Sequence, residues 1–318
     1  MKEFKDLSFK EFLESINQGQ FYYITSKEYI NMTEKECIKE NFYSMPCAKK
    51  EFNAIVLTDD FTIQKNLING KYRLKKSDII FHKDTNPENT EQLYKNLKEL
   101  EKYCNVVNPI ESKEICSSKW NSYVHLKEQN VPQPLTIRID EIDGKNHNQF
   151  KEQIKDIKFP CIVKIDDGCQ GEGVVKCDNF ESCISTCQAL LVKSDFVLVQ
   201  NFIENDGDYR VYVVGDEVIY TIKRIKPKGD FRNNVSQGGT SEKVDLPEKA
   251  KKVAINVVKA CKGIFIGVDL IEKDGNYYVL EVNSQPGISG FRNNGSNFKD
   301  NYDGNIVIFK KIIDFLKS

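Results

Sequence analysis

Three oxygen-bearing side chains interrupt an otherwise apolar stretch near the carboxyl end of the sequence: Asp269, Glu281 and Asn283. They lie in two β-rich runs on either side of a turn at residues 274–276. A carboxylate buried without a partner is energetically costly, so oxygens at such positions favour a bound cation. Ligand sets made only of oxygen favour Mg²⁺ or Mn²⁺ over Zn²⁺. The pattern therefore predicts a hard-metal site, of the kind typical of proteins that act on phosphate groups.

The loop between the two runs decides whether these side chains share a face of the sheet. A three-residue loop over 274–276 pairs Asp269 with Glu281, which places both of them and Asn283 on one face. A two-residue loop pairs Asp269 with Leu280 and turns Glu281 to the opposite face. A shared metal site therefore predicts the three-residue loop or an equivalent bulge. The simpler alternative, solvent-facing polar side chains, fits each residue alone better than all three together.

A glycine-rich segment at residues 162–175 is a candidate for covering a polyphosphate, because glycines let backbone N–H groups approach phosphate closely. The Walker and Rossmann motifs continue into a helix, whereas here a strand at 174–177 follows. We therefore predict a hairpin lying over phosphates, with an ordinary flexible hairpin as the alternative. Lys164, inside an apolar strand, is a candidate phosphate contact; the alternative is a lysine at the strand edge that reaches solvent.

A basic segment at residues 222–240 collects lysine and arginine side chains and then offers amides and glycines. Its Arg224 and Arg232 bring guanidinium groups, and Asn234 follows closely. Guanidinium forks and amides suit a phosphoryl group in transfer. A solvated loop is the alternative, since runs of charge usually are solvated.

The periodicity predicts mixed α/β structure that positions these segments. Residues 20–110 read as a small α/β domain, with strands at 21–25, 54–57, 78–81 and 106–108 and a helix at 93–103. Further on, helices are predicted at 119–129, 150–158, 180–192, 246–261 and 306–316, and strands at 135–139, 161–165, 174–177, 196–200, 209–214 and 218–223.

Composition limits the class of protein. A chain of 318 residues holds two or three packed units. The formal net charge of −1 gives no reason to expect nucleic acid or an anionic membrane as a partner. No apolar run approaches the roughly 20 residues of a membrane span, and the first residues do not read as a signal peptide. Ten cysteines without a CxxC pair predict reduced thiols in a cytoplasmic protein rather than a zinc ribbon.

In this order, the segments resemble the ATP-grasp superfamily, and within it the RimK-type ligases, which join amino acids such as glutamate to a carboxylate. The resemblance is strongest from about Lys119 to Gly290, with DFRNNVSQGG (230–239) and EVNSQPG (281–287) as its specific parts. It implies an α/β ATP-grasp fold: an N-terminal α/β pre-ATP-grasp domain at 1–118, a central lid subdomain at 119–197 and a C-terminal antiparallel-sheet subdomain with the metal site at 198–318. Residues 1–60 carry no usable match.

The resemblance also implies roles for individual residues. A first group would bind ATP: Lys119 and Lys164 on the phosphates, Gln170, Gly171 and Gly173 in the glycine-rich cover, Gln200, Asn201, Phe202 and Ile203 in the hinge that holds adenine, and Asp208 at the ribose. A second group would act on the reacting carboxylate and phosphate: Arg232, Asn234 and Arg224. Asp269, Glu281 and Asn283 would hold two Mg²⁺ ions, for which Mn²⁺ is an alternative.

The implied reaction is ATP-dependent joining of an amino acid to a carboxylate acceptor through an acyl phosphate. The acceptor would be a peptide, a protein C-terminus or a metabolite, and related ligases are often homo-oligomers. The runner-up is a kinase on the same fold that phosphorylates a hydroxyl, as of an inositol phosphate, because the lysines at 223–228 could bind a phosphorylated substrate. A non-catalytic nucleotide-binding module is a third hypothesis, which the intact metal positions disfavour.

Overall fold

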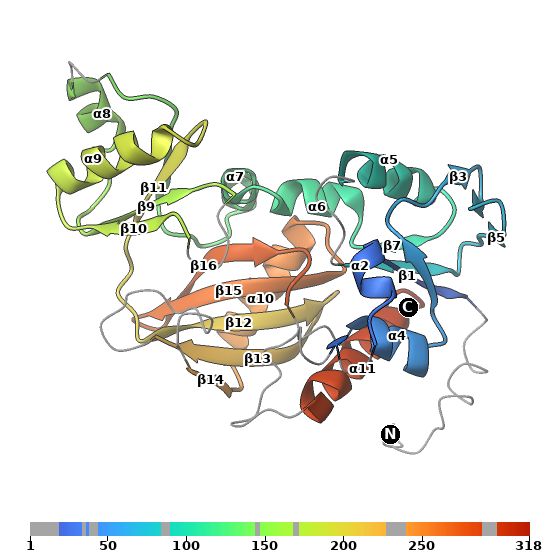
Figure 1. Cartoon of the computed structure of the whole chain (residues 1–318). Coiled ribbons are helices and arrows are strands. Elements are labelled where there is room, and N and C mark those ends of the chain that lie inside the picture. The colour runs from blue at the N-terminus through green and yellow to red at the C-terminus, as the bar shows by residue number, and fades with distance from the viewer. Residues whose placement is uncertain are drawn as a thin grey trace. The chain divides into compact units, whose positions relative to one another are not determined.

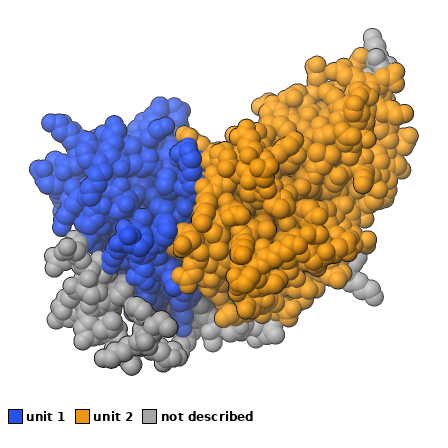
Figure 2. Space-filling model, turned by 180° about the vertical axis from the view of Figure 1, so that it is seen from behind, with its two compact units in different colours: residues 1–113, 262–265, 285–318 blue, residues 114–261, 266–284 orange. Residues whose placement is uncertain are grey.

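The computed structural model describes residues 19–33, 36–37, 44–83, 90–143, 147–167, 172–226, 240–287 and 298–318 (Figure 1). The chain divides into two compact units, coloured separately in Figure 2. Unit 1 comprises residues 1–113, 262–265 and 285–318, and unit 2 comprises residues 114–261 and 266–284. The division predicted from the sequence at 118/119 and 197/198 stays a prediction.

Unit 1 contains a parallel sheet in the strand order β2-β1-β6-β7 (Figure 1). Its strands are β1 (Phe21–Thr25), β2 (Ile55–Thr58), β6 (Ile79–His82) and β7 (Asn105–Val107). A small antiparallel sheet of β3 (Ile63–Gln64), β4 (Leu67–Ile68) and β5 (Tyr72–Arg73) follows β2. The helices are α2 (Lys27–Ile30), α4 (Ser44–Glu51), α5 (Thr90–Leu100), the start of α6 (Ile110–Cys116), and α11 (Phe298–Phe315).

Both faces of this parallel sheet are covered, which explains why its strands are apolar throughout. On one face, Tyr22 and Ile24 belong to the same buried cluster as three leucines of α5: Leu93, Leu97 and Leu100. On the other face, the ring of Phe309 in α11 lies 5.2 Å from that of Phe21 and 5.1 Å from that of Phe81, measured between centroids. The helical spacing of these three leucines therefore places them together on the buried side of α5.

Unit 2 contains an antiparallel sheet in the order β10-β9-β11-β8. Its strands are β8 (Thr136–Ile139), β9 (Cys161–Ile165), β10 (Val174–Cys177) and β11 (Val197–Asn201). The helices α8 (Asn148–Gln153) and α9 (Phe180–Leu191) pack on it through a buried cluster that includes Phe150, Cys183 and Cys187. The helical spacing of Cys183 and Cys187 thus serves packing, and every cysteine in the described part of the chain is a free thiol.

A second sheet of unit 2 has five strands in the order β14-β13-β12-β15-β16. They are β12 (Gly207–Val214), β13 (Glu217–Ile225), β14 (Thr240–Lys243), β15 (Phe265–Lys273) and β16 (Asn276–Asn283). Helices α7 (Lys119–Glu128) and α10 (Glu248–Ala260) share one buried cluster with inward residues of this sheet, among them Val211, Val268 and Val282. Residues that alternate with these along the strands, such as Arg210 and Asp269, lie on the opposite face.

The β15–β16 hairpin brings Asp269 opposite Glu281, as the shared-site hypothesis required. The loop has two residues, Asp274 and Gly275, because Lys273 pairs with Asn276. A bulge at Leu280 then shifts the register, since Leu270 pairs with Val279 and Asp269 with Glu281. The prediction of a three-residue loop or an equivalent bulge is therefore confirmed in its second form, the bulge. Both loop residues have positive φ, 52° and 71°, as a tight two-residue hairpin turn requires.

Among the described residues, no helix is long and apolar enough to cross a membrane.

Candidate active site

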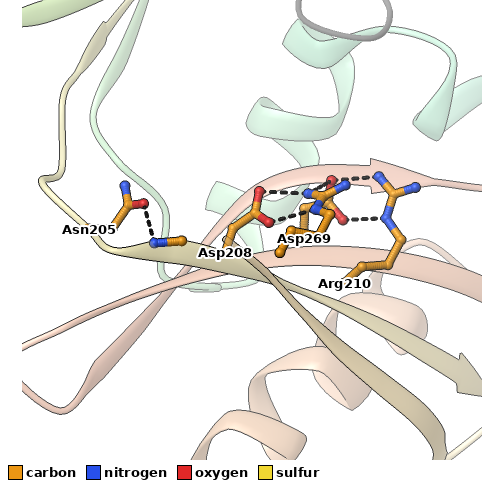
Figure 3. A network of polar contacts seen from close by, with 6 residues as sticks. Asn205, Asp208, Arg210 and Asp269 are labelled. Carbon is orange, nitrogen blue, oxygen red and sulfur yellow. Dashed lines mark hydrogen bonds and ion pairs between the residues drawn. The ribbon is translucent and has the colours of Figure 1, made fainter. Parts of the chain in front are cut away.

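Two arginines and two aspartates form a buried ion-pair network on the face of the five-stranded sheet opposite to α7 and α10 (Figure 3). Arg210 on β12 donates from Nε and Nη2 to the two carboxylate oxygens of Asp269 on β15, both at 2.6 Å. Arg224 on β13 donates to both oxygens of Asp208 at 2.6 Å and from Nη2 to Asp269 at 2.8 Å. Asp208 and Arg224 are direct cross-strand partners, which places both side chains on one face.

This network corrects the argument that a buried carboxylate by itself calls for a metal. Asp269 is only 3% exposed, and its cationic neighbours are guanidinium groups. Burial alone would raise the pKa of Asp269, but Arg210 and Arg224 outweigh burial and lower it to about 2. Asp269 is therefore ionised at neutral pH, and a metal ion bound to it would share it with, or displace, an arginine.

Asn283 offers a test of whether these residues fit a metal ion. Its Nδ2 is buried and has no hydrogen-bond partner within the described part of the chain. The two ends of an amide are told apart only by their hydrogen bonds, so a turned side chain would present its oxygen there. With the carboxylates of Asp269 and Glu281 this completes an oxygen donor set that suits Mg²⁺. No group of three His, Cys, Asp or Glu residues with such capacity occurs in the described ranges, so the amide would be needed.

Lys164 is a buried lysine at the centre of the smaller sheet of unit 2. It lies on the inner strand β9, is 8% exposed, and donates from Nζ to Oε1 of Gln200 at 3.1 Å. Gln200 Nε2 in turn donates to Oγ1 of Thr136 at 2.7 Å, which fixes the orientation of the amide. Burial lowers the pKa of Lys164 to about 8, against the attraction of nearby Glu281. The solvent-reaching alternative is therefore wrong.

Lys119 is held near Lys164 by the end of β9. Its Nζ donates to the backbone oxygen of Asp166 at 2.7 Å, and the Asp166 carboxylate accepts from the backbone N–H of Trp120 at 2.8 Å. Ser118 caps helix α7, which begins at Lys119, by accepting a hydrogen bond from the N–H of Asn121. The positive charge of Lys119 contributes to the lowered pKa of Lys164, after burial and the opposing effect of Glu281. Two ammonium groups and the Glu281 carboxylate thus gather in one region of unit 2.

The predicted hinge, residues 200–203, comprises the last two residues of β11 and the two that follow. Asn201 accepts from the N–H of Lys158 at 2.8 Å, and the ring of Phe202 lies 4.4 Å below the Lys176 ammonium. The carbonyl oxygen of Ile203 accepts from Asn205 Nδ2 at 2.8 Å, and Asn205 Oδ1 accepts from the N–H of Gly207 at 3.1 Å (Figure 3). Asn205 therefore ties the hinge to the start of β12.

Not every predicted site residue falls in the described ranges. Four lie outside them: Gln170, Gly171, Arg232 and Asn234. Gly173 is described, and its carbonyl accepts from the N–H of Ile165 at the base of the glycine-rich hairpin. Asp208, predicted at the ribose, has both carboxylate oxygens on Arg224, so its ribose role stays a prediction. Arg210 was missed, although a lone arginine in the apolar run 209–214 was the available signal.

Comparison with known proteins identifies the family. The model of the RimK-like ATP-grasp domain matches residues 116–306, more than half of the chain. The chain belongs to the RimK-like ATP-grasp family. The match starts just before α7, so it includes Lys119, Lys164 and the network of arginines and aspartates on the five-stranded sheet.

Curated relatives of this ATP-grasp chain share part of its length. A protein of Haemophilus influenzae strain Rd named probable alpha-L-glutamate ligase is 36% identical over 172 residues, covering 54% of this chain and 55% of its own. One of Trichodesmium erythraeum with the same name is 41% identical over 133 residues, covering 41% and 44%. The chain thus matches about half the length of these curated relatives.

Solved structures confirm the ATP-grasp fold over nearly the whole chain. D-alanine–D-alanine ligase from Bacillus anthracis superposes with a TM-score of 0.63 at 17% identity, covering 94% of this chain and 99% of its own. A RimK domain ATP-grasp protein from Sphaerobacter thermophilus gives 0.60 at 13% identity, covering 93% and 99%. ATP-grasp ligase PsnB complexed with minimal precursor, Mg and ADP gives 0.64 at 15% identity, covering 92% and 98%. The predicted fold class is therefore confirmed.

Proposed function

We propose that this protein is an ATP-dependent carboxylate–amine ligase that forms an amide bond through an acyl phosphate. The observation that carries the proposal is the register of the β15–β16 hairpin, which sets Asp269 opposite Glu281 inside the family match. The negative charge of Glu281 raises the pKa of Lys164, against the effect of burial. The two lysines and the carboxylates proposed to hold metal ions supply both kinds of group that a polyphosphate needs.

The chain's own residues supply positioning and charge in this scheme. Lys119 and Lys164 bind the ATP phosphates, and Gln200 orients the Lys164 ammonium through its side-chain oxygen. Asp269, Glu281 and Asn283 would hold the Mg²⁺ ions, whose chemistry is to neutralise and align the phosphate oxygens. Arg210 and Arg224, already fixed on this face, stabilise negative charge on the transferring phosphoryl group.

The reaction needs no side-chain nucleophile. The γ-phosphoryl group of ATP passes to the acceptor carboxylate and leaves ADP. The amine of the incoming amino acid then attacks the acyl carbon, and inorganic phosphate departs as the amide forms. Glutamate is the amino acid that the names of the curated relatives suggest, and the acceptor is a peptide, a protein C-terminus or a metabolite. Arg232 and Asn234 are proposed to contact the reacting carboxylate.

The kinase hypothesis gains no support from the comparisons. The named relatives are probable glutamate ligases, and the structural neighbours include ligases that act on amino acids or a peptide precursor. Among the described lysines of that segment, Lys223 lies over the ring of Tyr209 and Lys226 donates to the backbone oxygen of Asn205 at 2.6 Å. The basic segment is therefore a weaker argument for a phosphorylated substrate than the sequence alone suggested.

The decisive experiment incubates the protein with ATP, Mg²⁺, single amino acids and a panel of carboxylate acceptors. A ligase releases ADP and phosphate only when amine and carboxylate are both present, and mass spectrometry detects the amide. ADP release with phosphate retained on a hydroxyl of the product would contradict the proposal.

A matched pair of variants tests the site within that experiment. Glu281→Gln keeps the shape of the side chain and removes the charge, so product formation should fall by at least about a hundredfold while the fold is kept. Glu242→Gln, at an exposed position on β14, should leave the rate unchanged. Equal rates for both variants would mean that Glu281 has no part in the reaction.

A further inference from the structure

The parallel sheet of unit 1 has a topological switch point between β1 and β6. The chain passes from β1 to β2 on one side and later returns to β6 on the other side of β1. In open parallel sheets, ligands bind outside the carboxyl ends of the strands at such a point. Ser26 follows the carboxyl end of β1, and His82 is the last residue of β6.

The tautomer of His82 is determined by Gln285. Gln285 Nε2 lies 3.2 Å from the backbone oxygen of His82 and 3.2 Å from its Nδ1. A carbonyl oxygen can only accept, so the amide nitrogen must face it, and that nitrogen has only hydrogens to offer Nδ1. Nδ1 therefore accepts. Burial, with a smaller contribution from Lys113, holds the pKa of His82 well below its usual value, so the ring is neutral and carries its hydrogen on Nε2.

The Nε2–H donor of His82 is buried and has no hydrogen-bond partner among the described residues. Leaving such a buried donor unsatisfied is energetically unfavourable. Two hydroxyl oxygens are also buried without a hydrogen-bond partner among the described residues: Oγ of Ser26, which follows β1, and Oγ of Ser112, in α6 after β7. Asn108, which follows β7, shows the contrast, because both its Nδ2 and its Oδ1 bond to backbone groups of Ile264 and Phe265.

A buried positive charge completes the set. Lys113 is 1% exposed and lies near enough to His82 to lower its pKa. Its positive charge makes the surroundings of His82 more favourable for an anion than for a neutral group. The neighbourhood therefore offers hydrogen-bond donors and positive charge, which together select an oxyanion.

We propose that His82, with Lys113 and the hydroxyls of Ser26 and Ser112, forms a subsite for a carboxylate group at the switch point of the unit 1 sheet. The proposal rests on the ligase function for the identity of that carboxylate, which belongs to a substrate. Its source is either the α-carboxylate of the incoming amino acid or a carboxylate of the acceptor that does not react. Neutral Nε2–H of His82 donates to one oxygen, and Gln285 keeps it in the donating tautomer.

The test reads His82 directly by NMR on the full-length protein with ¹⁵N-labelled histidine. The chain has three histidines, and His82→Gln assigns the signal. Without ligand, Nδ1 should show the shift of an unprotonated nitrogen and Nε2 that of a protonated one. The probes are L-glutamate, L-isoglutamine with an α-carboxamide, N-acetyl-L-glutamate as an acceptor mimic, and inorganic phosphate.

Two results support the subsite and tell its sources apart. A shift of Nε2 with L-glutamate but not with L-isoglutamine assigns the α-carboxylate of the amino acid. A shift with N-acetyl-L-glutamate and none with free L-glutamate assigns the acceptor. No shift with any probe at millimolar concentration overturns the proposal, as does an equal shift with the carboxamide or a preference for phosphate. Because binding is read without turnover, ligase activity can fail while the subsite stands, or the reverse.

Variants test the same groups by calorimetry with whichever carboxylate probe shifts Nε2. His82→Leu and Lys113→Met should each raise the Kd by about tenfold or more, whereas His82→Gln, which keeps an N–H near the Nε2 position, should lose less. His147→Leu and Lys98→Met remove exposed groups of the same kinds and should leave the Kd unchanged. Equal losses for His82→Gln and His82→Leu would overturn the donor role. The NMR result on the unmodified protein decides the question even if a variant does not fold.

Discussion

Lys164 holds a buried charge that lowers stability, at a position proposed to bind ATP phosphates. Its folded-state pKa of about 8 lies below the value of about 10.4 for an unfolded lysine. Between these values the unfolded chain binds more protons than the folded one, so stability rises with pH in that window. Below pH 8 the cost of holding the charge is fully present, and polyphosphate oxygens would remove it on binding.

Replacing Lys164 with methionine should therefore stabilise the protein at neutral pH while removing nucleotide binding. We expect Lys164→Met to raise the unfolding free energy at pH 7 by about 1–3 kcal/mol, with the advantage shrinking as pH rises through 8 toward 10. Urea unfolding at pH 7 and 9.5 measures both. Lys151→Met, at an exposed position on α8, should show no such pH-dependent difference. A constant advantage for Lys164→Met at both pH values would contradict the lowered pKa.

The Asp208–Arg224 pair has a matched counterpart on the surface. That counterpart is the Arg138–Asp140 pair, in which the guanidinium also donates through Nε and Nη2 to an aspartate. The side chain of Asp208 is 7% exposed, whereas that of Asp140 is 60% exposed. Asp208→Asn leaves a buried arginine short of charge compensation and should lower the unfolding free energy by about 3 kcal/mol. Asp140→Asn should cost less than about 1 kcal/mol. Similar costs in urea unfolding would mean that burial does not decide the strength of these pairs.

At the scale of elements, the start of β12 depends on a glycine. A Cβ on Gly207 would lie 2.2 Å from the backbone oxygen of Arg224, so β12 and β13 would have to separate where Asp208 meets Arg224. Gly275, in the hairpin loop, has positive φ but no atom within 4 Å of a Cβ. We expect Gly207→Ala to cost more than about 2 kcal/mol and Gly275→Ala about 1 kcal/mol, by thermal or urea unfolding. A smaller cost at Gly207 than at Gly275 would show that the strands separate freely.

The sequence predicted elements whose apolar pattern is regular and missed those fixed by tertiary contacts. β1 and α5 were predicted, because the continuous apolar run of β1 and the helical period of α5 are visible in the sequence. The helix α4 and the edge strand β14 were not, since α4 is weakly amphipathic and β14 reads Thr-Ser-Glu-Lys. The β15–β16 hairpin was predictable in part. Placing Asp269 and Glu281 on one face requires an odd residue in the loop or a bulge in a strand, and the sequence does not distinguish the two.

The site was predictable in its residue types but not in its pairing. Oxygen side chains in apolar strands indicated a cation, but their spacing could not distinguish a metal ion from an arginine on a distant strand. Arg210 lies 59 residues from Asp269 and Arg224 lies 45 residues away, so only the strand order β13-β12-β15 brings them together. Likewise, Gln200 was assigned to the hinge through its backbone, whereas its side chain orients Lys164.

At the scale of the whole molecule, the proposed nucleotide site draws only on unit 2. Lys119, Lys164, Asp269 and Glu281 all belong to it, whereas the proposed carboxylate subsite belongs to unit 1. A ligand that binds only the folded state stabilises it by about 2.7 kcal/mol at a concentration one hundred times its Kd. Local opening is suppressed most in the segments that contact the ligand, so their amide hydrogens exchange more slowly.

Hydrogen exchange should therefore separate the two substrates by unit. With Mg²⁺ and ATP, we expect slower exchange in β9, β11 and the β15–β16 hairpin and little change in β1 and β6, while the carboxylate probe should slow exchange at the carboxyl ends of β1 and β6. Glu281→Gln should reduce only the nucleotide effect, because that residue lies in unit 2 and opposite Asp269. Nucleotide protection confined to β1 and β6 would place ATP on the wrong unit and overturn the assignment of Lys119 and Lys164.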